Sequence, residues 1–99
     1  MNSQSDCIEF CKILADPTRQ QILQLLLEKE RSVNEIVASF SLSQPTISHH
    51  LEVLTRMGLL SSRKDGKQIY YQTDKKQVTW CCGQLMAKFN PGAKLSEPE

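Results

Sequence analysis

Apolar side chains recur at helical spacing through most of this 99-residue chain, and the spacing changes to that of short strands only after the middle. We therefore expect one mainly α-helical domain with a small β-hairpin, in the order α-α-α-α-β-β-α. The expected helices cover residues 6–15, 17–29, 32–40, 43–58 and 74–89. The first of them has apolar side chains on more than one face, which favours packing on two sides and suggests a partner subunit.

The fourth helix has the sharpest pattern, a narrow apolar stripe opposite a short polar face. Ser43 is suited to cap its first turn, Pro45 fits there because a missing N–H costs nothing, and Gly58 ends the helix. Small donors and acceptors on the polar face suit base edges and phosphates better than a second core. The pattern is typical of a DNA recognition helix, with a stripe formed by Ile47, Leu51 and Leu54.

The neighbouring segments complete a DNA-binding unit. Ser32 and Glu35 form a capping-box pattern at the start of residues 32–40, and a short turn joins this helix to the recognition helix in a helix-turn-helix. Residues 59–63 and 68–73 are strand candidates, and Asp65-Gly66 between them is a signal for a tight turn. This hairpin stands in the position of a wing.

Charge and hydropathy narrow the class of protein. The net charge is only +1, but residues 56–76 hold six basic and two acidic side chains directly after the recognition helix. This local excess favours contact with phosphates. We expect a cytoplasmic protein without a membrane partner, because no apolar run is long enough to span a bilayer and the start of the chain has no secretory segment.

The runs LADPTRQQILQLL, SVNEIV, SLSQPTISHHLEVLTRMGLL and RKDGKQIYY resemble the arsenical-resistance (ArsR/SmtB) family of winged-helix repressors over roughly residues 13–73. The resemblance implies a winged helix-turn-helix domain over residues 1–91, followed by a tail over residues 92–99 that we expect to be disordered. It also implies a homodimer paired through the first and last helices, bound to a palindromic operator and released by an inducer. No cofactor is required for DNA binding.

Matched position by position, the resemblance assigns the operator contacts to the start of the recognition helix and to the wing. Two-fold pairing would place the two recognition helices about 34–36 Å apart, one turn of DNA. Phosphate contacts would make the affinity depend on salt. The implied DNA-binding residues are Gln44, Thr46, Ser48 and His49 on the helix and Arg63, Lys64 and Lys67 on the wing.

Two departures from the family pattern bear on the inducer. Many arsenic and cadmium sensors of the family have a Cys-x-Cys pair before the recognition helix, and here those positions hold Ser32 and Asn34. A second family site uses Asp, His and Glu side chains of the last helix for zinc, cobalt or nickel. This chain has Asp74 but no histidine beyond His50, so we expect both sites to be absent.

The chain has four cysteines, all on the two helices that the resemblance pairs in a dimer. Thiolates from two packed helices suit a soft ion, so we expect an As(III) or Sb(III) inducer, with Cd(II) as a further candidate. On the last helix, Cys82 falls on the stripe of Val78, Leu85 and Phe89 that we expect to face the core, with Cys81 on its flank. The candidate metal ligands are Cys7, Cys11, Cys81 and Cys82.

Three other interpretations of the cysteines stay open. The same thiols could sense oxidation or persulfides, or they could be small core side chains without a sensing role. A small thiol enzyme or a metal-buffering protein is an alternative from another class. The enzyme interpretation is disfavoured, because the sequence offers no general base beside a cysteine and no glycine-rich cofactor loop. Our leading hypothesis is a non-enzymatic repressor released by a thiophilic metalloid.

Overall fold

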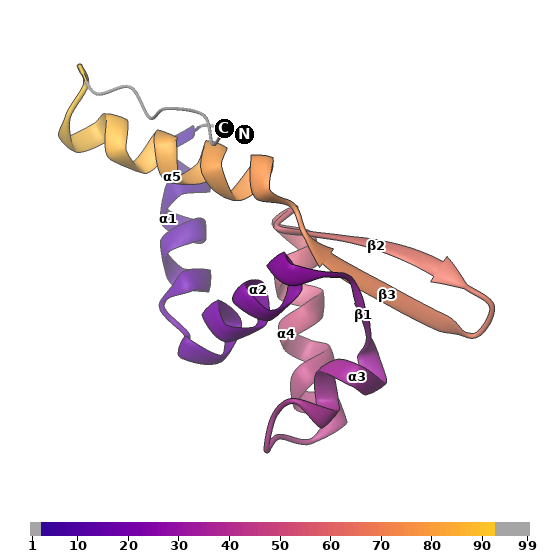
Figure 1. Cartoon of the computed structure of the whole chain (residues 1–99). Coiled ribbons are helices and arrows are strands. Elements are labelled where there is room, and N and C mark those ends of the chain that lie inside the picture. The colour runs from indigo at the N-terminus through magenta and orange to yellow at the C-terminus, as the bar shows by residue number, and fades with distance from the viewer. Residues whose placement is uncertain (1–2, 93–99) are drawn as a thin grey trace.

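The computed structural model describes the backbone of residues 3–92 and the side chains of residues 7–92. It confirms the predicted winged helix-turn-helix (Figure 1). No helix in this part of the chain has the length and apolarity that a membrane crossing requires. The predicted disorder after Gly92 concerns residues outside the described range. The elements are α1 (Ser3–Leu14), α2 (Pro17–Glu28), β1 (Arg31–Ser32), α3 (Val33–Ala38), α4 (Gln44–Arg56), β2 (Leu60–Asp65), β3 (Gln68–Thr73) and α5 (Lys75–Phe89).

Side-chain caps set the first residues of four helices. The Asp16 carboxylate accepts hydrogen bonds from the backbone at the start of α2, and Ser43 and Asp74 do the same for α4 and α5. At α3 the predicted capping box is present: Ser32 accepts from the Glu35 N–H, and the Glu35 carboxylate accepts from the Ser32 N–H. Each cap satisfies N–H groups that the first helical turn leaves without a partner.

The sheet has one strand more than the sequence predicted. Its order is β1-β3-β2, and the two-residue β1 pairs antiparallel with β3 through Arg31 and Ser32. The second correction concerns the hairpin: β2 runs to Asp65 rather than ending at Arg63. Asp65 pairs with Gln68, so the loop has only two residues, and Gly66 adopts the positive φ of +64° that such a loop needs.

The core lies between α2, α4 and the base of the sheet, with α1 and α5 packed against each other at one end (Figure 1). The buried Thr73 hydroxyl donates to the Leu23 carbonyl at 2.8 Å and ties β3 to α2. The hairpin extends away from this core, which leaves the wing in solvent. The fully buried large side chains are Phe10, Ile22, Leu26, Ile36, Ile47, Leu51, Leu54 and Leu59.

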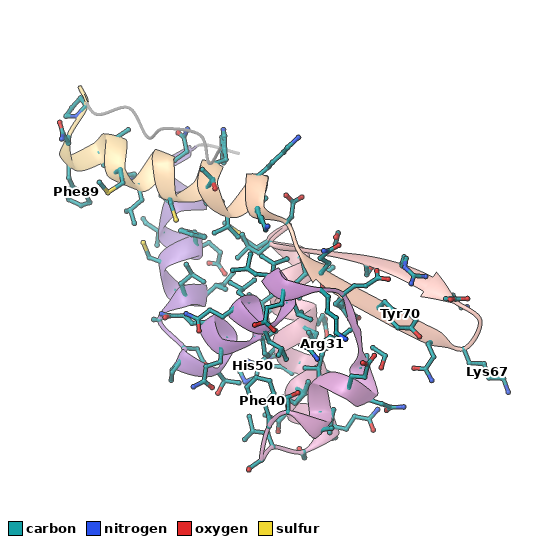
Figure 2. The ribbon with its side chains drawn as sticks, in the orientation of Figure 1. Arg31, Phe40, His50, Lys67, Tyr70 and Phe89 are labelled. Carbon is teal, nitrogen blue, oxygen red and sulfur yellow. The ribbon has the colours of Figure 1, made fainter. Side chains whose placement is uncertain are left out.

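Helix α5 is rotated relative to the prediction. Cys81 is the buried residue of the helix, with 3% of its surface exposed, whereas Cys82 and Val78 are only partly buried at the edge of the core. Phe89 is 82% exposed and lies at the far end of the helix (Figure 2). The prediction that Cys82 faces the core and Cys81 its flank is therefore wrong, because Cys81 is the buried residue while Val78 and Cys82 pack only partly against the core and Phe89 faces solvent.

Candidate nucleic-acid interface and cysteine pair

The N-terminal half of α4 presents a polar surface to solvent. Ser43 fixes its start, since the Ser43 hydroxyl accepts from the Thr46 N–H at 3.4 Å and lies 2.9 Å from the Thr46 hydroxyl. The apolar stripe on the opposite face is fully buried, as predicted, so the helix cannot rotate without exposing it. The sequence-predicted reading residues are all exposed, namely Gln44, Thr46, Ser48 and His49.

The two histidines of α4 have different surroundings. His49 is exposed, and His50 is partly buried beside α2, where the Arg19 Nε donates to its Nδ1 at 3.1 Å. Burial lowers the pKa of His50, and the charges of Arg19 and His49 act in the same direction against that of Asp16. A neutral His50 therefore joins α2 to the recognition helix.

The three basic residues predicted on the wing differ in their contacts: the two lysines extend into solvent, whereas the arginine is bound by carboxylates of the same chain. Lys64 and Lys67 are exposed, and Lys67 lies at the tip of the hairpin (Figure 2). Arg63, at the middle of β2, is bound by other side chains of the same chain. Of the three predicted wing contacts, the two lysines are the ones that the fold offers to DNA directly.

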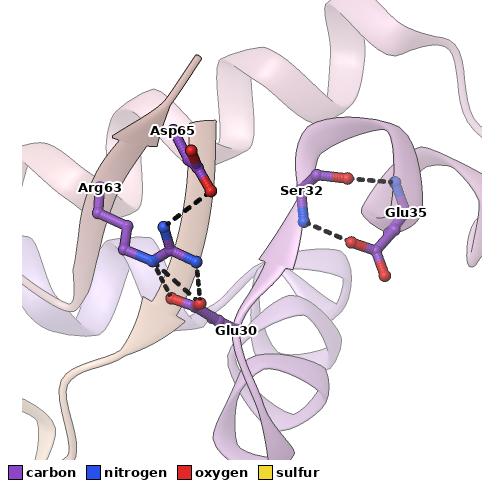
Figure 3. A network of polar contacts seen from close by, with 5 residues as sticks. All are labelled: Glu30, Ser32, Glu35, Arg63 and Asp65. Carbon is purple, nitrogen blue, oxygen red and sulfur yellow. Dashed lines mark hydrogen bonds and ion pairs between the residues drawn. The ribbon is translucent and has the colours of Figure 1, made fainter. Parts of the chain in front are cut away.

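Arg63 binds two carboxylates, those of Glu30 and Asp65 (Figure 3). Its Nε donates to Glu30 at 2.9 Å, and its NH2 group forms an ion pair with the same carboxylate. Its NH1 group lies 3.5 Å from the Asp65 carboxylate, and its guanidinium stands 4.6 Å from the centre of the Tyr70 ring. These contacts raise the pKa of Arg63, the Glu30 hydrogen bond foremost, and the Arg63 hydrogen bond lowers the pKa of Glu30.

Glu30 was missed by the sequence analysis. It lies in the turn after α2, 33 residues from Arg63, within a run of mixed charges that carries no local motif. Only the pairing of β1 with β3 brings this turn beside the hairpin. No pattern within either segment could have indicated the contact.

The four predicted metal ligands divide into two buried and two accessible thiols. Cys7 and Cys81 are 4% and 3% exposed and belong to the interior of the α1 and α5 contact. Cys11 is exposed and Cys82 partly exposed. Burial and then the charge of Cys11 raise the pKa of Cys82. These two residues lie on α1 and α5, which pack against each other.

The described residues of one chain do not form a complete metal site. Among the described residues, no three His, Cys, Asp or Glu side chains are grouped so that they could hold a metal ion. Cys11 and Cys82 are therefore the two accessible thiols of the packed helices α1 and α5, and the four sulfurs do not form one cluster.

Comparison with known proteins gives consistent matches. The family model described as "Bacterial regulatory protein, arsR family" matches residues 16–62. The "Probable mercury resistance operon repressor" of Streptomyces lividans is 42% identical over 70% of this chain and 55% of its own length. The "Arsenical resistance operon repressor" of Staphylococcus aureus is 43% identical over 71% of this chain and 67% of its own length.

The fold has matches among solved structures as well. The homodimeric winged helix-turn-helix DNA-binding domain of a Mycobacterium bovis protein superposes with a TM-score of 0.71 at 26% identity, over 96% of this chain and 90% of that one. The chain spans little more than half of the mercury repressor that it matches. The region matched by the family model includes the helix-turn-helix and extends into β2 as far as Ser62.

Proposed function

This chain belongs to the arsR family of bacterial regulatory proteins, and we propose that it is a homodimeric repressor released from its operator by a thiophilic metalloid. Proteins of this family are DNA-binding transcriptional regulators, not enzymes. The observation that carries the finer proposal is the accessible pair of thiols, Cys11 and Cys82, shared by α1 and α5.

DNA binding is assigned to the exposed face of α4 and to the wing lysines. Donors and acceptors at the start of α4 are small enough to approach base edges in the major groove. Lys64 and Lys67 extend from a hairpin beside that helix and would contact phosphates, which position the protein without reading sequence. A two-fold dimer with one such helix in each subunit requires a palindromic site.

Dimerisation is assigned to α1 and α5. These helices expose large apolar side chains that a protomer alone leaves in water: Ile8 on α1 and Trp80, Met86 and Phe89 on α5. A second copy that covered them would remove this surface from solvent, which a small domain favours. The structural neighbour described as homodimeric supports a homodimer.

The inducer proposal follows from the chemistry of the pair. Arsenous acid condenses with two thiols to give a dithioarsenite and two molecules of water, so Cys11 and Cys82 are sufficient to retain it. Soft sulfur ligands favour As(III), Sb(III) and Cd(II) over hard cations. A bond between α1 and α5 would change the dimer that spaces the recognition helices, and the same coupling would make DNA weaken inducer binding.

The test uses a duplex that the protein itself selects from a random pool. Arsenite titrated into the protein–duplex complex should lower the fluorescence anisotropy of the labelled duplex to that of free DNA. Arsenate, which does not condense with thiols in the same way, serves as the control. Release by neither arsenite, antimonite nor cadmium would contradict the metalloid proposal while leaving DNA binding intact.

A second candidate function is favoured by the same pair and by the absence of a third ligand nearby within the described residues. Two neighbouring thiols treated with peroxide would form one disulfide and two molecules of water. In this alternative, oxidation releases the repressor. Mass spectrometry would show the loss of two hydrogens between Cys11 and Cys82 together with loss of DNA binding, and neither change would occur if the pair binds only metalloids.

A further inference from the structure

The guanidinium of Arg63 already has the contacts that it would make with a DNA phosphate. The Glu30 carboxylate occupies its Nε and NH2 edge, and the Asp65 carboxylate lies beside NH1 (Figure 3). The Tyr70 ring lies against one face of the guanidinium. A phosphate would use the same edge, because carboxylate and phosphate both accept parallel N–H bonds from arginine. Phosphate cannot reach that edge while Glu30 remains there.

The charge balance opposes phosphate as well. One guanidinium faces two carboxylates, so the Arg63 cluster presents a net negative charge on a wing that otherwise carries lysines. The Arg63 and Glu30 side chains are 51% and 37% exposed, so solvent and DNA can reach the pair. An exposed pair of this kind is weak enough to exchange partners.

We propose that Glu30 is an internal substitute for a DNA phosphate, which competes for Arg63 and holds down the affinity of the wing for DNA of any sequence. The opposite role would be a positioning one, in which Glu30 orients Arg63 toward DNA. The geometry favours competition, because the donor edge of Arg63 is directed to the carboxylate and not to solvent. The proposal rests on DNA binding by the wing but not on the inducer.

Salt dependence separates the two roles. Each phosphate that a cation neutralises adds about 0.9 to the slope of log affinity against log salt. Glu30→Gln removes the competing charge and frees Arg63 for one phosphate. We expect the variant to bind a mixed-sequence duplex at least about fivefold more tightly at about 50 mM salt. The slope should be steeper by about 1.8, because a bound homodimer has two Arg63 side chains.

Glu28→Gln is the matched control. Glu28 lies two residues before Glu30 and also forms an ion pair with an arginine, Arg31. It removes the same charge from the same segment without touching Arg63. A larger effect of Glu30→Gln than of Glu28→Gln supports competition. Equal effects of the two substitutions would mean that the gain comes only from removing a negative charge near the DNA. Weaker binding by Glu30→Gln would assign Glu30 a positioning role. Either result overturns the proposal.

A double-mutant cycle supplies a readout that does not depend on absolute affinity. In an Arg63→Met background, Glu30→Gln should change neither the affinity nor the salt slope beyond the Glu28→Gln control. An undiminished effect in that background would overturn the proposal. Thermal melting at equal protein concentration verifies that each variant is folded. No inducer is present in these measurements, so their outcome is independent of the metalloid test.

Discussion

Serine substitutions at the two adjacent cysteines of α5 should affect different properties: Cys81→Ser should lower the stability of the fold, and Cys82→Ser should abolish release from DNA by arsenite. Cys81 is 3% exposed, and a serine hydroxyl in its place would carry a more polar group into the interior. The Cys81 sulfur accepts from Gln77 Nε2 at 3.8 Å, and the shorter C–O bond of serine would lengthen this contact. Burying the hydroxyl at this position costs roughly 1–3 kcal/mol. For a domain of this size, 1 kcal/mol lowers the melting temperature by about 4–8 °C, so Cys81→Ser should lose roughly 5–20 °C. Its release by arsenite should remain.

Cys82→Ser makes the same chemical change one residue later, where the side chain is only partly buried. We expect a loss of stability below about 1 kcal/mol, typical of sites away from the core, and release by arsenite should be abolished. The assays are thermal melting at equal protein concentration and fluorescence anisotropy of the selected duplex with rising arsenite. Normal release of Cys82→Ser, or loss of release by a Cys81→Ser protein of unchanged melting temperature, would refute the assignment of the accessible pair.

Three further predictions concern the DNA-binding face. Ser43→Ala removes the cap of α4 and should cost about 1 kcal/mol of unfolding free energy in urea, with weaker binding to the selected duplex. Lys67→Gln removes one wing cation from each subunit of the dimer and should lower the slope of log affinity against log salt by about 1.8 for every sequence, whereas Lys88→Gln, on the distant end of α5, should not. His50 has a pKa below its usual 6.5 because of burial, with the charge of Arg19 contributing in the same direction. The contribution of His50 to the free energy of unfolding is therefore complete above about pH 6.5 and falls as the pH drops toward its folded pKa. A His50→Gln variant should lose less stability than the natural chain between pH 7.5 and 5.5. Equal losses would contradict this.

Local sequence patterns were sufficient to predict the helices, because helix caps and apolar periodicity both act within a few residues. Ser43 and Asp16 mark helix starts through hydrogen bonds to N–H groups two or three positions ahead. The stripe of α4 has a single apolar face, so its burial follows from sequence alone. Strand β1 could not be predicted in this way, because its two residues are a strand only through their pairing with β3.

Helix α5 shows where periodicity becomes ambiguous. It has apolar side chains on two faces, and the longer stripe through Cys82 and Phe89 was assigned to the core. The fold buries Cys81 instead, while Val78 and Cys82 are only partly buried at the edge of the core and Phe89 is exposed. A helix that is apolar on two faces can bury one of them within its own chain. Which face is buried depends on how the helix packs against its neighbour, and the spacing of apolar residues does not determine this.

The wing shows that a local count of basic residues is also an incomplete guide to the contacts with DNA. The sequence indicates three basic residues on the hairpin, but their value to DNA depends on which carboxylates the fold brings near. Lys64 and Lys67 extend into solvent, while Glu30 reaches Arg63 from 33 residues away. Counting local charge therefore overestimates the number of phosphates that the wing can neutralise by one. If Glu30 competes as proposed, the natural chain should show a salt slope that fits two wing contacts in each subunit, and Glu30→Gln should show one that fits three.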